Sequence, residues 1–257
     1  HCFINREYFK GKNKMIPLAK PHIDKEDIRE VVEVLESGAL SLGPKIEEFE
    51  EKFAKQIGTK YAIAVNSGTS GLHLCIKALN IKEGDEVITT PFSFIASANC
   101  ILFEKAKPVF VDVDEETFNI NPELIEAKIT DKTKAILLVH VFGQSCDMNK
   151  IVAIAKKHNL KIIEDACESI NAVYEQKKVG TFGDAAVFAF YPNKQMTTGE
   201  GGMIVTNNKE IADLTKSLRN QGRSNNMQWL THNLLGYNYR LTDIQAALGI
   251  SQLNKID

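Results

Sequence analysis

Short apolar runs that alternate with helical segments constrain the fold of this chain more than any other feature of its sequence. The runs are nearly continuous in apolar character, which is typical of strands covered on both faces of a sheet. The helical segments between them fit the right-handed crossovers of parallel strands. We predict strands at residues 61–65, 85–90, 107–113, 135–141, 161–166, 185–190 and 203–205. The sequence therefore predicts an α/β fold with a mostly parallel seven-stranded sheet and helices on both faces.

The first two helices are predicted from apolar side chains that recur at helical spacing. In residues 24–37 these side chains are Ile28, Val31, Val32 and Leu35. They predict a buried face, and Asp24 predicts the N-cap. In residues 43–58 they are Ile46, Phe49, Phe53 and Ile57. Gly58 predicts the end of that second helix.

Further helical segments and one hairpin separate the strands. We expect helices at residues 70–79, 94–105, 121–129 and 147–159. A charged stretch at residues 173–181 predicts a small hairpin at the surface. No repeat or low-complexity tract interrupts the pattern, so it belongs to one domain.

Composition and charge exclude several classes of protein. The 257 residues carry a formal net charge of -2 without a basic stripe, so we expect no nucleic-acid partner. No apolar run approaches the roughly 20 residues of a membrane span, and the first residues lack the apolar stretch of a secretory signal. The five cysteines include no C-x-x-C pair and predict reduced thiols. We therefore expect a cytoplasmic protein with no membrane partner and no metal site.

The two ends of the chain suggest that its boundaries are not those of a complete gene product. The chain starts on His1, whereas Met15 offers a natural start. We therefore expect residues 1–14 to be a leader outside the fold. Residues 15–257 are expected to form the domain, which we expect to be truncated because the chain stops at the close of a helical pattern.

A turn that could bind phosphate follows the strand predicted at residues 61–65. It reads Asn-Ser-Gly-Thr-Ser-Gly and opens a helix. Gly68 would let the backbone come close, and the amides of Thr69 and Ser70 would face a ligand at the helix N-terminus. A simple helix cap explains these residues as well. The turn is neither a Walker loop nor a dinucleotide fingerprint, because neither motif is present.

Two charged side chains follow other predicted strands. Asp165 ends one strand and Lys194 comes after another. Ligands of open α/β sheets bind beyond the carboxyl ends of strands, so both could reach one site. Taken alone, Asp165 could cap a helix and Lys194 could be a solvated surface charge. Together with the phosphate turn and the Thr-Thr-Gly-Glu-Gly-Gly turn at 197–202, they favour pyridoxal 5′-phosphate, with Lys194 as the amine that forms a Schiff base.

Four more side chains are candidates for the same site. Phe92 and Phe94 follow a strand, and either could stack on the cofactor ring or belong to the core; we prefer Phe94. Asn238 and Arg240 precede a helix that Thr242 or Asp243 could cap. Their donors suit phosphate or carboxylate, although a surface loop is an equally good explanation.

Five segments, in this order, resemble the DegT/DnrJ/EryC1/StrS family of sugar aminotransferases, which belong to fold type I of the pyridoxal-phosphate enzymes. They are "NSGTSGLHL", "DEVITTPFSFIASAN", "KIIEDACES", "FAFYPNKQMTTGEGG" and "GYNYRLTDIQAALG". The resemblance implies a homodimer that transfers an amino group from glutamate to a nucleotide-linked keto sugar. Its products would enter surface polysaccharides or other amino-sugar compounds.

The resemblance also implies a role for each matching residue. Lys194 would be the Schiff-base lysine, and Asp165 would pair with the pyridine nitrogen. Phe94 would stack on the ring, and Asn238 would reach the phosphate of the other subunit's cofactor. The phosphate of its own cofactor would be held by Gly68, Thr69 and Ser70.

The chain departs from the family pattern at two positions and in its length. Glu168 stands where many members have glutamine or histidine, beside the cofactor's O3′. Ala189 stands where many have a serine that contacts the phosphate. We also expect this chain to lack the small C-terminal domain of the family. These departures leave open a non-catalytic cofactor-binding fragment or regulator, and more weakly a lyase or a cysteine desulfurase. A family branch with histidine in place of the lysine dehydrates sugars, and Lys194 argues against it.

Overall fold

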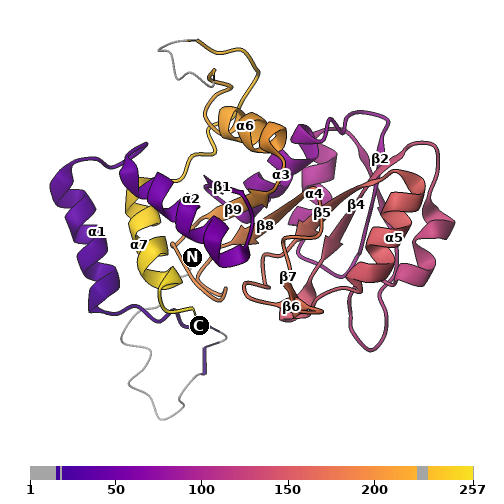
Figure 1. The fold of residues 1–257 in the computed structure, drawn as a ribbon, viewed down its shortest axis with the longest axis horizontal. Coiled ribbons are helices and arrows are strands. Elements are labelled where there is room, and N and C mark those ends of the chain that lie inside the picture. Colours follow the sequence, from indigo (N-terminus) through magenta and orange to yellow (C-terminus); the bar gives the residue numbers. More distant parts are fainter. Residues whose placement is uncertain (1–15, 18, 225–230, 257) are drawn as a thin grey trace.

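A computed structural model describes residues 16, 17, 19–224 and 231–256 of the chain (Figure 1). Its main feature is a seven-stranded sheet with the strand order β1-β9-β8-β5-β4-β2-β3. The strands are β1 (Tyr61–Val65), β2 (Glu86–Thr89), β3 (Lys107–Phe110), β4 (Thr133–Val139), β5 (Lys161–Asp165), β8 (Ala185–Ala189) and β9 (Gly202–Thr206). Only β9 is antiparallel to its neighbours, β1 and β8. The predicted mostly parallel seven-stranded sheet is therefore confirmed.

The register of the sheet brings three strand ends to one edge. Asp165 at the end of β5 pairs with Val187 of β8. The last residue of β8, Ala189, and the last residue of β1, Val65, both pair with Gly202 at the start of β9. The segments that follow β1, β5 and β8 therefore emerge at the same edge. These segments carry the predicted phosphate turn, the residues after Asp165 and the loop with Lys194.

Helices cover both faces of the sheet, as predicted. They are α1 (Lys25–Ser37), α2 (Pro44–Ile57), α3 (Gly68–Ala78), α4 (Ala96–Phe103), α5 (Met148–His158), α6 (Lys209–Leu218) and α7 (Asp243–Leu253). Apolar side chains of α3, α4 and α6 pack on one face. On the other face α2 and α7 cover the β1 side and α5 covers the β4 side. Figure 1 shows α1 beside α7, at the end of the molecule away from α5.

Polar caps fix the ends of several helices. Asp24 forms a capping box at the start of α1, and Gly58 ends α2 with a φ of 92°, both as predicted. Thr242 caps α7, whereas the Asp243 carboxylate turns toward α2. It accepts hydrogen bonds from the amides of Lys45 (2.8 Å) and Ile46 (3.2 Å) in the first turn of α2. Asp243 therefore caps a helix far away in the sequence, which the sequence did not reveal.

The predicted buried face of α1 is wrong. Its side chains Ile28, Val32 and Leu35 are exposed, and the helix instead buries Val34 and Asp27. The buried Asp27 carboxylate is tolerated on that face because the Lys255 ammonium lies 2.7 Å from its Oδ2 atom. An ion pair therefore decides which face of α1 meets α7.

Two smaller predictions have different outcomes. Residues 121–129 form two short 3₁₀ turns, Pro122–Leu124 and Glu126–Lys128, in place of a helix. Ile125 lies between the two turns and is fully buried, which anchors this segment to the core. The predicted hairpin at 173–181 is present as β6 (Val173–Tyr174) and β7 (Lys177–Lys178).

Three further findings apply only to the described residues, which leave out the expected leader at 1–14. None of their helices is long and apolar enough to cross a bilayer. No cluster among them could hold a metal ion. Their four cysteines are free thiols, while Cys2 lies outside the described part.

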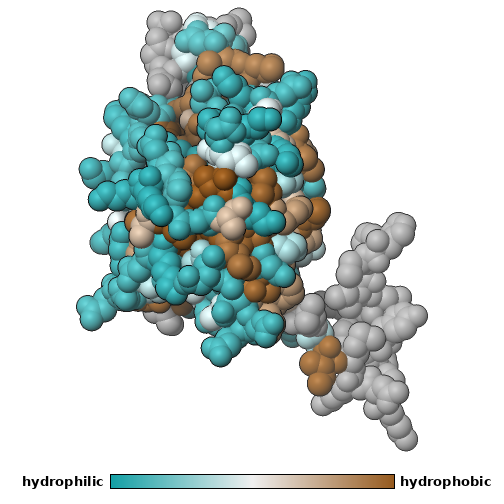
Figure 2. Space-filling view, turned by 90° about the vertical axis from the view of Figure 1, so that its right-hand side faces the viewer, coloured by the Kyte–Doolittle hydropathy of each residue, from teal (hydrophilic) through white to brown (hydrophobic). Residues whose placement is uncertain are grey.

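On the side of α5 and β2, Figure 2 shows apolar surface gathered between polar side chains.

Candidate active site

A cavity of about 460 Å³ opens at the edge where β1, β5 and β8 end. Its walls include Gly68 and Thr69 at the start of α3, Phe94, Asp165 at the end of β5, and Lys194 after β8. This volume suits a small organic cofactor. The fold therefore brings five of the predicted site residues into one cavity, although they come from four distant segments of the chain.

A second cavity of about 390 Å³ adjoins the first one. The two share Phe94, Asp165, Cys167 and Lys194. Glu168, which the sequence placed near the cofactor, lines this second cavity. The two cavities together form one elongated site, with Lys194 and Asp165 at the junction.

Asp165 is held in place by two neutral donors. The Ser97 hydroxyl donates a hydrogen bond to its Oδ2 atom at 2.7 Å, and the Cys167 amide donates to Oδ1 at 3.2 Å. The side chain is only 6% exposed. Within the described part of the chain, Asp165 has no ion pair. Its buried charge is therefore available to a cationic group inside the cavity.

Lys194 points into the protein and is only 16% exposed at its side chain. Its Nζ atom donates a hydrogen bond to Oε1 of Glu168 at 2.9 Å. The other carboxylate oxygen of Glu168 accepts from the amide of Phe142 at 3.2 Å. Glu168 thus contacts the proposed nucleophile itself and links it to the loop after β4.

The start of α3 combines a helix cap with a close contact to β8. Ser67 is the N-cap, and its hydroxyl accepts from the Ser70 amide at 3.1 Å. The Ser70 hydroxyl donates to Asn66 at 2.6 Å. The amide and the hydroxyl of Ser70 therefore both serve the cap, and Ser70 is not among the residues that line the cavity. Gly68 and Thr69 do line it, and first-turn amides have no partner within a helix.

Gly68 is required by the way α3 packs on the sheet. A Cβ atom at this position would lie 2.9 Å from Cβ of Ala189 and 2.9 Å from Sγ of Cys167. Glycine therefore lets the helix N-terminus approach β8 and forms part of the cavity wall. Ala189 itself presents a methyl group to the cavity where the family pattern suggests a hydroxyl.

The two candidate aromatic residues have different surroundings. Phe94 is 77% exposed and lines both cavities. Phe92 lines only the second cavity, and its ring lies 5.8 Å from that of Phe118 and 6.0 Å from that of Phe142. Phe94 is therefore the better placed of the two to cover a ring bound beside Asp165.

Asn238 lies outside both cavities and is exposed. Its carbonyl oxygen accepts from the side-chain amide of Asn66 at 3.4 Å. Arg240 donates to Asn220 at 3.1 Å and is likewise outside. The structure thus brings neither residue to the site of its own chain. A role for Asn238 would require a second subunit.

A partly buried polar network fixes the backbone on either side of Asn238. The rings of Tyr237 and Tyr239 are stacked at 4.9 Å, and Tyr239 contacts Nδ1 of His73 at 3.2 Å. His73 Nε2 lies 2.8 Å from the Glu104 carboxylate. Burial lowers the pKa of His73, so the neutral ring donates to Glu104 and accepts from Tyr239. This arrangement attaches the Asn238 segment firmly to α3.

A fully buried carboxylate, Glu164, stabilises the backbone next to Asp165. Glu164 accepts hydrogen bonds from His140 (3.1 Å) and from the amides of Gly180 (2.7 Å), Phe182 (2.8 Å) and Gly183 (2.7 Å). Burial alone would raise the pKa of Glu164, but these donors outweigh it and the pKa is lowered. Glu164 therefore ties the loop before β8 to β5 and fixes the position of its neighbour Asp165.

Sequence reasoning missed two residues that contact the site directly. Ser97 orients Asp165, and Cys167 lines both cavities. Burial and the nearby Asp165 carboxylate raise the pKa of Cys167 well above its usual value, so its thiol is not activated. Both lie within segments that resemble the family, but no motif or spacing marked them as separate candidates.

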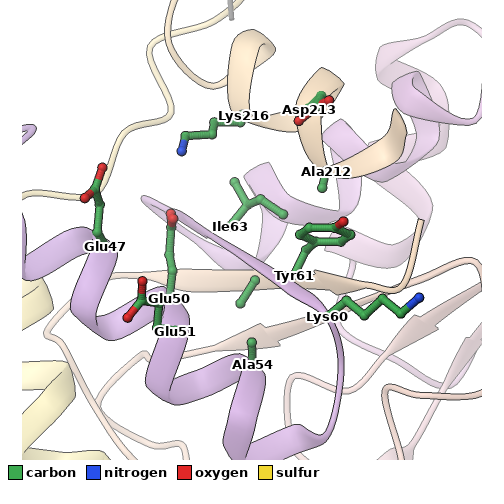
Figure 3. Close-up of a pocket in the computed structure, with 11 residues that line it drawn as sticks. Glu47, Glu50, Glu51, Ala54, Lys60, Tyr61, Ile63, Ala212, Asp213 and Lys216 are labelled. Atoms are coloured by element: carbon green, nitrogen blue, oxygen red, sulfur yellow. The ribbon is translucent and has the colours of Figure 1, made fainter. Parts of the chain in front are cut away.

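Another hollow, of about 330 Å³, lies between α2, β1 and α6 (Figure 3). None of the predicted site residues lines it. Glu50, which lines it, accepts from the Ala64 amide at 2.9 Å, and Arg219 bonds both Glu50 and the Ala64 carbonyl. This ion pair occupies backbone groups of the edge strand β1. At this hollow the exposed edge of the sheet is therefore protected from pairing with another strand.

Comparison with known proteins gives consistent matches. The model of the DegT/DnrJ/EryC1/StrS aminotransferase family matches residues 21–257. The spore coat polysaccharide biosynthesis protein SpsC of Bacillus subtilis is 45% identical over 255 residues, which make up 96% of this chain and 66% of that protein. GDP-perosamine synthase of Caulobacter vibrioides is 46% identical over 244 residues, 94% of this chain and 65% of that protein.

A solved structure agrees with these sequence matches. PseC of Helicobacter pylori, an aminotransferase involved in the biosynthesis of pseudoaminic acid, has a TM-score of 0.90 and is 36% identical. The match covers 95% of this chain and 66% of that one. The chain thus spans slightly less than two thirds of the length of these relatives.

Proposed function

Because this chain belongs to the DegT/DnrJ/EryC1/StrS aminotransferase family, we propose that it acts as a pyridoxal-phosphate-dependent sugar aminotransferase. It would transfer an amino group from glutamate to a nucleotide-linked keto sugar, for surface polysaccharide or amino-sugar biosynthesis. The names of SpsC and GDP-perosamine synthase support this substrate class. A cytoplasmic homodimer is part of the same proposal and rests on the resemblance alone.

One observation carries the proposal. A buried carboxylate without an ion pair in the described chain, Asp165, and a largely buried amine, Lys194, line the same cavity. An enzyme that uses pyridoxal phosphate needs an anion beside the ring nitrogen and an amine beside the aldehyde. The amides of Gly68 and Thr69 at the start of α3 add a place for the phosphate. The residues present therefore fit this cofactor.

The chemistry divides between the cofactor and the chain. When bound, pyridoxal phosphate supplies an aldehyde that takes up amines and a ring that accepts the electrons of a carbanion. Asp165 would hold a proton on the ring nitrogen, and Ser97 keeps that carboxylate correctly turned. Phe94 would exclude water from one face of the ring.

Lys194 would attach the cofactor and later carry a proton to and from the reacting carbon of the substrate. As an ammonium ion it cannot attack an aldehyde, so it must first lose a proton. Glu168 Oε1, 2.9 Å from Nζ, positions the amine at the junction of the two cavities.

The proposal is tested by reducing the cofactor-loaded protein with borohydride and mapping the labelled peptide. We expect the label on Lys194, and its loss in Lys194→Ala. Lys209→Ala is a matched control, because Lys209 is an exposed lysine that pairs with Asp213 and lies far from the cavity. In a separate sample that has not been reduced, adding glutamate should change the absorbance spectrum of the bound cofactor. A label elsewhere, or none, would contradict the proposal.

A second candidate is a non-catalytic protein that keeps the cofactor site. The methyl group of Ala189 in the cavity wall favours it, because a phosphate contact expected from the family is missing there. This candidate predicts a label on Lys194 without any response of the absorbance to glutamate. The same experiment therefore separates the two.

A further inference from the structure

A third cavity adjoins Lys194 on another side, with a volume of about 230 Å³. One wall is the extended segment 19–22, and the other is the loop 192–197 that carries Lys194. Gln252 of α7 closes it, and its side-chain amide donates to the carbonyl of His22 at 2.9 Å. The segment before α1 is thereby attached beside the proposed reaction centre.

The lining of this cavity is rich in hydrogen-bond donors. The residues that line it include Lys20, His22, Asn193 and Gln195, beside Lys194. None of the described residues that line it is acidic. A polar cavity with cations and without carboxylates is suited to an anionic ligand.

Nearby carboxylates do not cancel this positive character. Glu168 pairs with Lys194 at 2.9 Å, so the positive character of this cavity comes from Lys20 and His22 and not from Lys194. Asp27 accepts from Gln252 at 3.1 Å, and its charge is balanced by Lys255 at 2.7 Å. Lys20 and His22 have no ion pair within the residues that the structure describes. Both side chains are exposed and therefore available to a ligand.

We propose that this cavity binds an anionic group of a substrate, and that Lys20 and His22 are specificity residues that contact it. The volume admits a carboxylate or a phosphate group but not a whole nucleotide. Because the cavity shares Lys194 and Asn193 with the cofactor cavity, the bound anion would hold the rest of the substrate near the amine. The inference rests on the proposed function for the identity of the substrates, glutamate or a sugar nucleotide.

Binding of two unreactive probes tests the inference and identifies the source of the anion. Glutarate represents the carboxylates of an amino donor, and inorganic pyrophosphate represents a nucleotide-linked sugar. Each is titrated calorimetrically into cofactor-loaded protein, so that the cofactor's own phosphate site is filled. The variants are Lys20→Gln, His22→Asn and both together. Lys25→Gln is the control, because it removes an equal charge from an exposed position five residues further on that does not line the cavity.

We expect each single replacement to weaken one probe about threefold to tenfold, and the double replacement more than either. A loss confined to glutarate assigns the cavity to the amino donor, and a loss confined to pyrophosphate assigns it to the nucleotide part. If neither probe binds, or if the two single variants and the double variant all bind the probes like Lys25→Gln, the inference is wrong. The borohydride label on Lys194 does not depend on this result, so failure of the inference and failure of the proposed function can be told apart.

Discussion

At the scale of single residues, the site depends on contacts that hold a charge in place. Asp165 would act through its buried carboxylate, yet its orientation depends on the hydroxyl of Ser97 at 2.7 Å. The Ser93 hydroxyl lies 2.8 Å from that of Ser97 and does not contact Asp165. This pair of serines allows the contribution of one hydrogen bond to be measured.

Ser97→Ala should lower the free energy of unfolding by about 1–3 kcal/mol, because it leaves a buried carboxylate with one donor fewer. It should also weaken cofactor binding, since Asp165 could turn away from the ring nitrogen. Urea unfolding and fluorescence titration with pyridoxal phosphate measure the two effects. Ser93→Ala is the control and should affect both much less. Equal effects of the two variants would contradict a specific role for Ser97.

Much of this site could be predicted from residue order, and the remainder depends on geometry. Lys194, Asp165 and Gly68 stand out because each follows a strand, and parallel strands end at one edge. The sequence left two roles open for Ser70, because a serine at the start of a helix can serve a ligand or the cap, and here its amide and hydroxyl contact Ser67 and Asn66 of the cap. Ser97 could not be found, since its partner is 68 residues away in the sequence.

At the scale of elements, α1 illustrates how tertiary contacts decide the orientation of a helix. Its helical spacing and Asp24 cap were sufficient to predict its limits, but not which face would be buried. Asp27 fixes the buried face through its contacts with Gln252 and Lys255 near the end of α7. Sequence patterns assign apolar residues to the core by default, and they cannot anticipate an ion pair formed by distant segments.

The Asp27 contact makes stability depend on pH in a defined window. Burial alone would raise the pKa of Asp27, but Lys255 and the amide of Asp24 outweigh it and lower the pKa to about 2, from 3.8. A lowered pKa means that the stabilisation is complete above pH 4 and is lost as the pH falls toward 2. The difference corresponds to about 2 kcal/mol.

Asp27→Asn should therefore be less stable than the natural chain by about 2 kcal/mol at neutral pH. The gap should close as the pH falls from about 4 to about 2, because the natural carboxylate is then protonated too. Urea unfolding at a series of pH values measures this gap. Glu26→Gln, which alters an exposed pair with Arg29 on the same helix, provides the control. A gap that stayed constant with pH would show that charge is not the cause.

At the scale of the whole molecule, the site of one chain lacks Asn238. The network of His73, Glu104, Tyr237 and Tyr239 fixes the segment around Asn238, while its side chain lies outside both cavities. A backbone segment fixed in this way would suit a residue whose side chain contacts a neighbouring subunit. If the protein is a homodimer, each cofactor would be held by both chains.

Mixing two variants, each with a different defect in the site, tests this arrangement. Asn238→Ala should weaken cofactor binding about tenfold if its amide contacts the partner's phosphate, and Lys194→Ala should abolish the borohydride label. When the two variants are unfolded together and refolded as mixed dimers, half of the dimers contain one chain of each kind. In each of these, one site combines an intact Lys194 with an intact Asn238. About one quarter of all sites should therefore bind and be labelled like the natural protein, which requires that sites are shared between two chains. Asn238→Ala protein with natural affinity, or a mixture without this tight-binding class, would mean that each chain completes its site alone.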